Sequence, residues 1–217
     1  MRERIVIGSR GSRLALWQAG WVRERLSALD PRADVRVEII KTSGDVLHDA
    51  VLTSIGGQGA FTRELQQALL ARRIDIAVHS LKDLPTVTPA GLALGIETRD
   101  ATRTVDEEII TLAARLAHAP TRDACLAERA LLRCFGAGCQ VPIAAHATVS
   151  GGALRLEGLV ASASGETIIR ESIEGDAADA ERLGDELAAR LISLGAETVL
   201  SAVESARQIG AAAGVSE

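Results

Sequence analysis

Three short polar segments of the sequence carry residues that could bind or transfer charged groups. They are Ser9-Arg10-Gly11-Ser12, Thr42-Ser43-Gly44-Asp45 and Ser80-Leu81-Lys82-Asp83, and each follows a short run of apolar, β-branched residues. If these runs are parallel strands, the three segments meet at the carboxyl edge of one sheet, where α/β proteins bind ligands. The spacing therefore predicts one cleft lined by charged and hydroxyl groups.

The first segment is suited to an anion. Arg10 and Ser12 stand just before a predicted helix, where free backbone N–H groups and the helix dipole favour negative charge. An arginine there can hold a carboxylate through two hydrogen bonds. An equally good interpretation of this loop alone is that Ser12 is an ordinary N-cap and Arg10 a surface charge.

The third segment offers a carboxylate, Asp83, beside the amine of Lys82. A carboxylate that faces a cleft can stabilise a developing cation or pass a proton to a leaving amine. The competing interpretation is a polar turn ended by Pro85, and it also applies to Asp45, which we expect to be a turn residue.

A cysteine in a flexible loop is the remaining reactive group. Cys139 lies in Gly136-Ala-Gly-Cys139-Gln-Val-Pro142, which is too rich in glycine to bury it as an ordinary apolar side chain and suits a nucleophile or an attachment point. A cysteine with a purely structural role is an equally good interpretation of this loop alone. Cys125 and Cys134 fall in a helical pattern and are assigned to packing. The histidines have no metal-ligand spacing, so no metal site is predicted.

These residues need two kinds of scaffold. In the first half, strands alternate with helices, which predicts a parallel sheet with helices on its faces. We expect strands at 5–7, 35–40, 74–78 and 92–96, and helices at 14–29, 62–71 and 104–118. The last helix is predicted from a capping box that starts at Thr104. Beyond Pro120, consecutive strands and flanking helices predict an α+β domain, with strands at 143–149, 154–161 and 167–173 and helices at 122–132, 178–194 and 198–209. We therefore expect domains at 1–119 and 120–217.

Composition excludes several classes of function. The 217 residues include 24 basic and 29 acidic side chains, and Lys41 and Lys82 are the only lysines, so no lysine-rich surface for nucleic acid is expected. No apolar run is long enough to cross a membrane, and the first apolar run is too short for a signal peptide. Three cysteines cannot all pair, which favours a reducing compartment. We expect a cytoplasmic protein with no membrane or nucleic-acid partner.

Five blocks of residues resemble the porphobilinogen deaminase (hydroxymethylbilane synthase) family and follow its order along the chain. They are GSRGSRLALWQA at 8–19, KTSGD at 41–45, GGQGAFTREL at 56–65, DIAVHSLKDLPT at 75–86, and ERALL at 128–132 with GCQVPI at 138–143. The resemblance implies one α/β lobe of the type II periplasmic-binding-protein kind, with a parallel or mixed sheet and flanking helices, followed by a small C-terminal α+β domain.

The resemblance also implies a transferase of tetrapyrrole biosynthesis, which joins four porphobilinogen molecules into hydroxymethylbilane and releases ammonia. In this family the chain grows on a dipyrromethane cofactor, whose attachment matches Cys139. Asp83 matches the carboxylate that steers the leaving amine, with Lys82 beside it. The family positions that hold acetate and propionate groups match Arg10, Ser12, Ser80 and Lys82, and the resemblance places Asp83 among the cofactor-binding residues as well.

One part of the family pattern is missing. After Leu92 the family continues into a whole second domain, whereas Ala93–Arg99 resembles the segment where the chain returns to the first domain. Part of the charge compensation for a polyanionic product is then lost. Three hypotheses follow: a compact deaminase, as a monomer or as a dimer that supplies the missing wall; a catalytically impaired remnant or pyrrole-binding module; or an unrelated small-anion binding protein, which would leave Cys139 unexplained.

Overall fold

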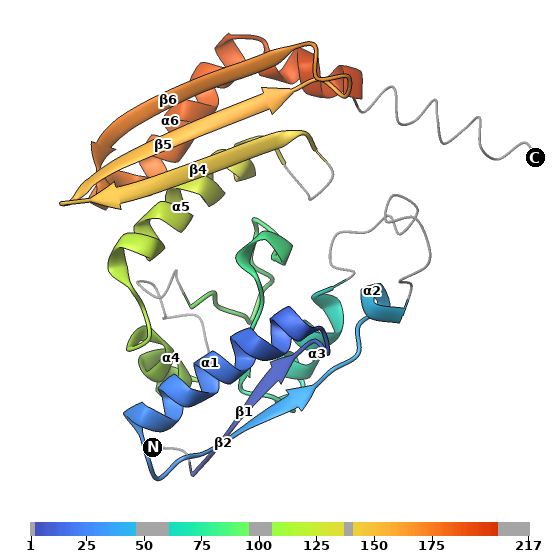
Figure 1. Ribbon diagram of the computed structural model, residues 1–217, viewed down its shortest axis with the longest axis vertical. Coiled ribbons are helices and arrows are strands. Elements are labelled where there is room, and N and C mark those ends of the chain that lie inside the picture. The colour runs from blue at the N-terminus through green and yellow to red at the C-terminus, as the bar shows by residue number, and fades with distance from the viewer. Residues whose placement is uncertain (1–2, 47–60, 96–105, 137–140, 204–217) are drawn as a thin grey trace, which may run out of the picture. The chain divides into compact units, whose positions relative to one another are not determined.

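The computed structural model describes residues 3–46, 61–95, 106–136 and 141–203 (Figure 1). The chain divides into two compact units, Met1–Ala117 and His118–Glu217, and each is described by itself. This division lies close to the boundary expected from the change in sequence pattern. Within the described residues, no helix is both long enough and apolar enough to cross a membrane.

The first unit is built on a parallel three-stranded sheet. Its strands are β1 (Arg4–Ser9), β2 (Asp34–Ile39) and β3 (Ile76–Ala77), in the order β2-β1-β3. Helix α1 (Arg13–Leu29) connects β1 to β2, and α3 (Arg63–Leu70) precedes β3. The parallel α/β arrangement predicted from the alternation of strands and helices is confirmed.

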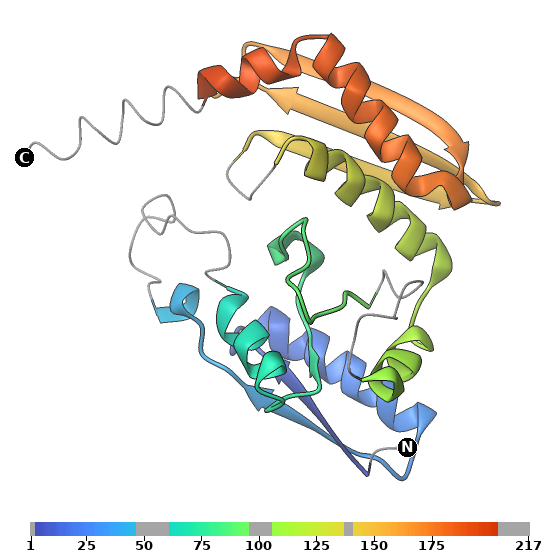
Figure 2. The same ribbon diagram turned by 180° about the vertical axis from the view of Figure 1, so that it is seen from behind.

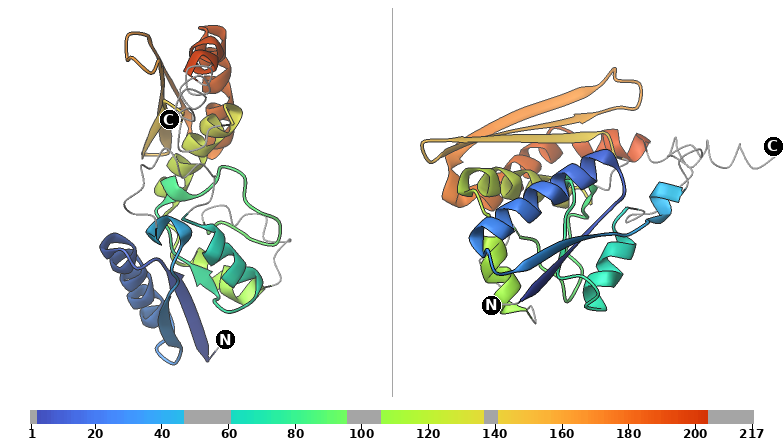
Figure 3. Two further views of the ribbon diagram at one scale, coloured as in Figure 1. Left: turned by 90° about the vertical axis from the view of Figure 1, so that its right-hand side faces the viewer. Right: turned by 60° about the horizontal axis from the view of Figure 1, so that its bottom comes forward.

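Alternate side chains of β1 point to opposite faces of this sheet, and each face has its own core. Ile5 and Ile7 pack with α1 and with α4 (Glu107–Ala114), whereas Val6 packs with α3 and Ile74. Helices α1 and α3 accordingly lie on opposite sides of the sheet (Figure 3). Because β1 is covered on both faces, its carboxyl end is held firmly at the edge where the polar segments begin.

Two predictions for the first unit need correction. The described part of the predicted strand 92–96 is not a strand; residue 96 lies outside the described residues. The Leu-Ala-Leu run there has little β preference, and Gly91 before it has a φ of 83°. Helix α4 is capped by Asp106, whose side chain accepts from the Ile109 N–H, so the predicted start at Thr104, outside the described residues, is not the cap.

The second unit is an α+β domain, as predicted. Strands β4 (Ile143–Ser150), β5 (Ala153–Ala161) and β6 (Ile168–Asp176) form an antiparallel sheet in the order β4-β5-β6. Helices α5 (Ala119–Cys134) and α6 (Ala180–Ser193) cover one face of it (Figure 2). The core contains the apolar side chains that alternate along β5 and the buried leucines of both helices. Beyond α6, residues 196–203 are also helical.

The remaining short elements lie at the ends of the strands. Helix α2 (Ser43–Val46) follows β2, and the 3₁₀ turns η1 (Leu81–Asp83) and η3 (Ala177–Asp179) follow β3 and β6. The segments that follow β2 and β3 are therefore folded into helical turns, which fix the directions of the side chains they carry.

Candidate active site

The carboxyl edge of the parallel sheet brings Arg10, Asp45 and Asp83 together, as the three polar segments predicted. Arg10 donates from Nε (3.1 Å) and Nη2 (2.7 Å) to Asp45 Oδ1. Its Nη1 lies 3.8 Å from Asp83 Oδ2. The three side chains are 17%, 21% and 25% exposed, so they form a partly buried charge cluster that a ligand can still reach.

Asp45 is more than the turn residue expected from the sequence. Its second oxygen, Oδ2, accepts from the hydroxyl (2.8 Å) and from the backbone N–H (3.3 Å) of Thr42, which is buried. Burial raises the pKa of Asp45, but the hydrogen bonds from Arg10 and Thr42 outweigh this effect, and the net pKa is lowered. Asp45 is therefore ionised at neutral pH.

Phe61 covers one face of the Arg10 guanidinium, 4.1 Å from the ring centroid. The ring also lies against the backbone of Gly44, where a Cβ would collide with Phe61 Cδ1 and Cε1. Glycine is therefore required at position 44 for the ring to come this close. The KTSGD and GGQGAFTREL blocks thus contribute to one structure around Arg10.

The two predicted serines lie at the same edge of the sheet. Ser12 caps α1, since its Oγ accepts from the Ala15 N–H at 3.3 Å, which confirms the N-cap interpretation. Ser80 Oγ pairs with the side-chain amide of Gln18 from α1, at 3.1 and 3.3 Å. Gln18 belongs to the GSRGSRLALWQA block, but the sequence gave no sign that it pairs with Ser80, 62 positions away.

His79 is a further group that the sequence reasoning set aside. It is partly buried and precedes Ser80. Burial lowers its pKa, Asp83 raises it and Arg10 lowers it, with a net lowering, so the imidazole is neutral at pH 7. Among the described residues, no group of histidines, cysteines and carboxylates is arranged to hold a metal ion.

The structure describes one predicted site residue, Lys82, only by its backbone, and it does not describe another, Cys139. The backbone of Lys82 belongs to η1, but its side chain is not described, and Cys139 lies outside the described residues. Along the chain, Cys139 falls in the connection between α5 and β4. The assignment of Cys134 to packing is wrong: this thiol is exposed at the end of α5 and donates to Asp185 Oδ1 at 3.4 Å.

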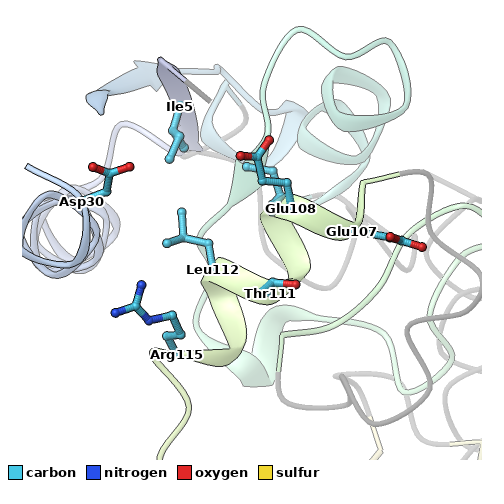
Figure 4. A pocket seen from close by; sticks show the side chains of 8 residues that line it. Ile5, Asp30, Glu107, Glu108, Thr111, Leu112 and Arg115 are labelled. Atoms are coloured by element: carbon cyan, nitrogen blue, oxygen red, sulfur yellow. The ribbon is translucent and has the colours of Figure 1, made fainter. Parts of the chain in front are cut away.

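A cavity of about 430 Å³ in the first unit lies away from this site (Figure 4). It is bounded by the start of β1, the end of α1 and helix α4. Its lining combines apolar side chains, such as Ile5 and Leu112, with the carboxylates Asp30, Glu107 and Glu108 and the cation Arg115. None of the residues predicted to bind or transfer charged groups lines this cavity, so the charge cluster around Arg10 is the better candidate site.

A hydrogen bond joins the two elements that flank the Cys139 connection. Glu128 of α5 accepts from the Ala147 N–H of β4 at 2.7 Å, and His146 Nδ1 lies 3.9 Å from the same carboxylate oxygen. Burial raises the pKa of Glu128, the bond from Ala147 and the nearby His146 lower it, and the net pKa is raised. The folded unit therefore binds this proton more tightly than the unfolded chain does.

We expect Glu128→Gln to remove a pH dependence of stability. A raised pKa in the folded state means that wild-type stability falls as pH rises from about 4.5 through the raised value. Glutamine keeps an acceptor for Ala147 and cannot ionise. The Tm of Glu128→Gln minus the Tm of wild type should rise by about 2–4 °C between pH 4 and pH 8, as measured by circular dichroism.

The matched control for this experiment is Glu174→Gln, at an exposed carboxylate of β6 that pairs with Arg155. It removes one carboxylate charge at an exposed position and so reports the effect of the charge change by itself. A Tm difference for Glu128→Gln that stays constant from pH 4 to pH 8 would show that Glu128 does not titrate as described.

Comparison with known proteins finds a match for the sequence of each unit. A sequence model described as porphobilinogen deaminase, dipyrromethane cofactor binding domain, matches residues 5–126, and the model of the C-terminal domain of porphobilinogen deaminase matches residues 123–193. The chain belongs to the porphobilinogen deaminase family. The family resemblance and the two-part fold expected from the sequence are thus confirmed.

Curated relatives of the family align with nearly the whole chain. The porphobilinogen deaminase of Trichlorobacter lovleyi is 32% identical, with 93% of this chain and 97% of the relative covered. That of Pelobacter propionicus is 34% identical, with 91% and 96% covered. The first alignment extends over 302 residues, whereas this chain has 217, so the relative contains a long stretch with no counterpart here.

The described site residues fit the cofactor that names the family's first domain. The carboxylate groups of a dipyrromethane need cationic or hydrogen-bonding donors. Arg10 is such a cation, Ser12 and Ser80 carry hydroxyls, and the N–H groups at the start of α1 face the same edge. Asp83, 3.8 Å from Arg10, adds a negative charge to the same cluster.

Proposed function

We propose that this chain carries out the reaction of its family: it joins four porphobilinogen molecules head to tail into hydroxymethylbilane and releases ammonia at each step. The observation that carries the proposal is the meeting of Arg10 and Asp83 at the carboxyl edge of the sheet, in a chain whose two units both match the family. We further propose Cys139 as the residue that bears the dipyrromethane.

The described residues divide the chemistry between binding and charge stabilisation. Arg10, with Ser12 and Ser80, binds acetate and propionate groups through charge-assisted hydrogen bonds. Asp83 stabilises the positive charge that develops on a porphobilinogen ring as its C–N bond breaks and ammonia leaves. When bound, the dipyrromethane supplies the pyrrole carbon that forms the first new C–C bond. Lys82 is proposed to assist from the neighbouring position.

The shortness of the chain supports a second candidate, a pyrrole-binding module with impaired turnover. We propose that the stretch without a counterpart follows Leu92, where the sequence passes directly to the segment that returns to the first domain. If that stretch supplies part of the charge compensation, each lost charge-assisted hydrogen bond weakens binding of the growing product by about 1.5–3 kcal/mol.

We also propose a cytoplasmic protein, monomeric in the simplest case. Its free thiols among the described residues, Cys125 and Cys134, suit a reducing compartment. A dimer in which a second copy supplies the missing wall is the alternative, and the mass of the native protein in solution distinguishes the two states.

The deciding measurement is the intact mass of the purified protein before and after incubation with porphobilinogen. We expect wild type to carry a covalent increment of two linked pyrroles and to gain further one-pyrrole steps, whereas Cys139→Ser carries neither. Cys134→Ser, which changes an exposed thiol in the same unit, is the matched control and should behave as wild type.

Two other results would change the proposal. A two-pyrrole increment without further steps would favour the pyrrole-binding module over the deaminase. An unmodified mass for wild type, Cys139→Ser and Cys134→Ser alike would contradict both the covalent cofactor and the proposed reaction.

A further inference from the structure

Arg10 has two carboxylate neighbours, and it is bound to only one of them. Its Nε and Nη2 both donate to Asp45, at 3.1 and 2.7 Å. Asp83 lies 3.8 Å from Nη1, which is beyond hydrogen-bond distance. Asp45 therefore holds one edge of the guanidinium, and the Asp83 carboxylate is not held in a close ion pair with Arg10.

The plane of the guanidinium is fixed as well as its edge. Phe61 lies over one face at 4.1 Å, and Asp45 holds the Nε side. An arginine held on one face and one edge keeps a single orientation, so the entropy of ordering it is not lost when a ligand binds. The Nη1 group is the part of Arg10 left to face Asp83 and a ligand carboxylate.

Asp45 itself is anchored in the buried part of the unit. Both the hydroxyl and the N–H of Thr42 donate to Oδ2, and Thr42 is 1% exposed. Oδ1 is thereby left for Arg10. The two oxygens of one carboxylate thus connect a buried residue after β2 to a site residue after β1.

We propose that Asp45, oriented by Thr42, is a positioning residue of the reaction: it sets the direction of Arg10 toward the carboxylates of the substrate and prevents Arg10 from closing onto Asp83. This inference rests on the proposed function. Without Asp45, the freed guanidinium pairs with Asp83, the nearest remaining carboxylate, and both residues are lost to the substrate at once.

The test is a double-mutant cycle with Asp45→Asn, Arg10→Lys and the double variant. We expect Asp45→Asn to reduce kcat by about 10- to 100-fold, as for a misdirected binding group, and to retain the wild-type Tm within a few degrees. If Asp45 acts through Arg10, the double variant is no worse than Arg10→Lys alone. Asp45→Glu should restore part of the loss, and Asp34→Asn, at an exposed carboxylate of β2, should have no effect.

A second readout does not depend on turnover. Porphobilinogen binding to Cys139→Ser protein is measured by calorimetry with and without Asp45→Asn, and the Kd should rise by about tenfold, which corresponds to about 1.4 kcal/mol. If Asp45→Asn does not fold, Thr42→Val removes the 2.8 Å hydrogen bond alone and should weaken binding in the same direction by a smaller factor.

The possible results distinguish a failure of the positioning role of Asp45 from a failure of the proposed function. If wild type gains pyrroles and Asp45→Asn equals it in kcat and Kd, or if the Asp45 and Arg10 effects simply add, the positioning role is wrong and the proposed function stands. If wild type neither binds porphobilinogen nor gains mass, the proposed function fails, and the positioning role falls with it.

Discussion

Replacing Asp83 with asparagine is expected to reduce kcat by about 10²- to 10⁴-fold, the range for loss of a positioned acid–base or charge-stabilising group. Asparagine preserves the size of the side chain and removes its charge. In the proposed mechanism, the positive charge that develops on the pyrrole as ammonia leaves then lacks its counter-charge, whereas the substrate carboxylates keep their proposed partners Arg10, Ser12 and Ser80. The loss should therefore fall on kcat far more than on KM.

The measurement is steady-state product formation, together with the intact mass of the purified variant. We expect Asp83→Asn to retain whatever pyrrole increment wild type carries, because attachment is assigned to Cys139. Asp34→Asn makes the same chemical change at an exposed carboxylate of β2 and should keep wild-type rates. Turnover of Asp83→Asn within a factor of a few of wild type would remove Asp83 from the mechanism.

Replacing Leu187 with alanine should cause the largest loss of stability in the second unit, about 2–5 kcal/mol. Leu187 of α6 is fully buried and packs against the sheet, close to Gly158 of β5. Truncation leaves a cavity between the helices and the sheet that the surrounding side chains fill only in part.

Urea unfolding followed by far-ultraviolet circular dichroism measures this loss. The control is Leu194→Ala, which makes the same truncation at a side chain that is 53% exposed, and it should change stability by less than about 0.5 kcal/mol. Equal effects for the two variants would show that the second unit does not have the core described here.

The close approach of α5 and α6 is a feature that sequence patterns did not predict. At Gly184 of α6, a Cβ would lie 2.5 Å from the Ala127 carbonyl oxygen and 2.6 Å from Ala130 Cβ. In the sequence, a glycine within a helical pattern indicates only a weak helix position. The structure shows that the absent side chain is what allows the two helices to touch.

The sequence by itself determined the elements and the edge at which the site forms. The apolar runs before Arg10 and Asp83 predicted parallel strands, and the rule that ligands bind at their carboxyl ends placed both residues in one cluster. Hydrophobic periodicity likewise predicted α1 and the antiparallel strands of the second unit. These features depend on neighbours along the chain and on the common geometry of α/β units, so local patterns suffice.

Only the tertiary structure decided which groups in that cluster contact one another. Asp45 binds Arg10, Phe61 covers Arg10, and Gln18 pairs with Ser80, and in each case the two residues are too far apart in the sequence for a local pattern to predict the contact. Hydrogen bonds and ring contacts act over a few ångströms, so their partners are determined only when packing brings distant segments together.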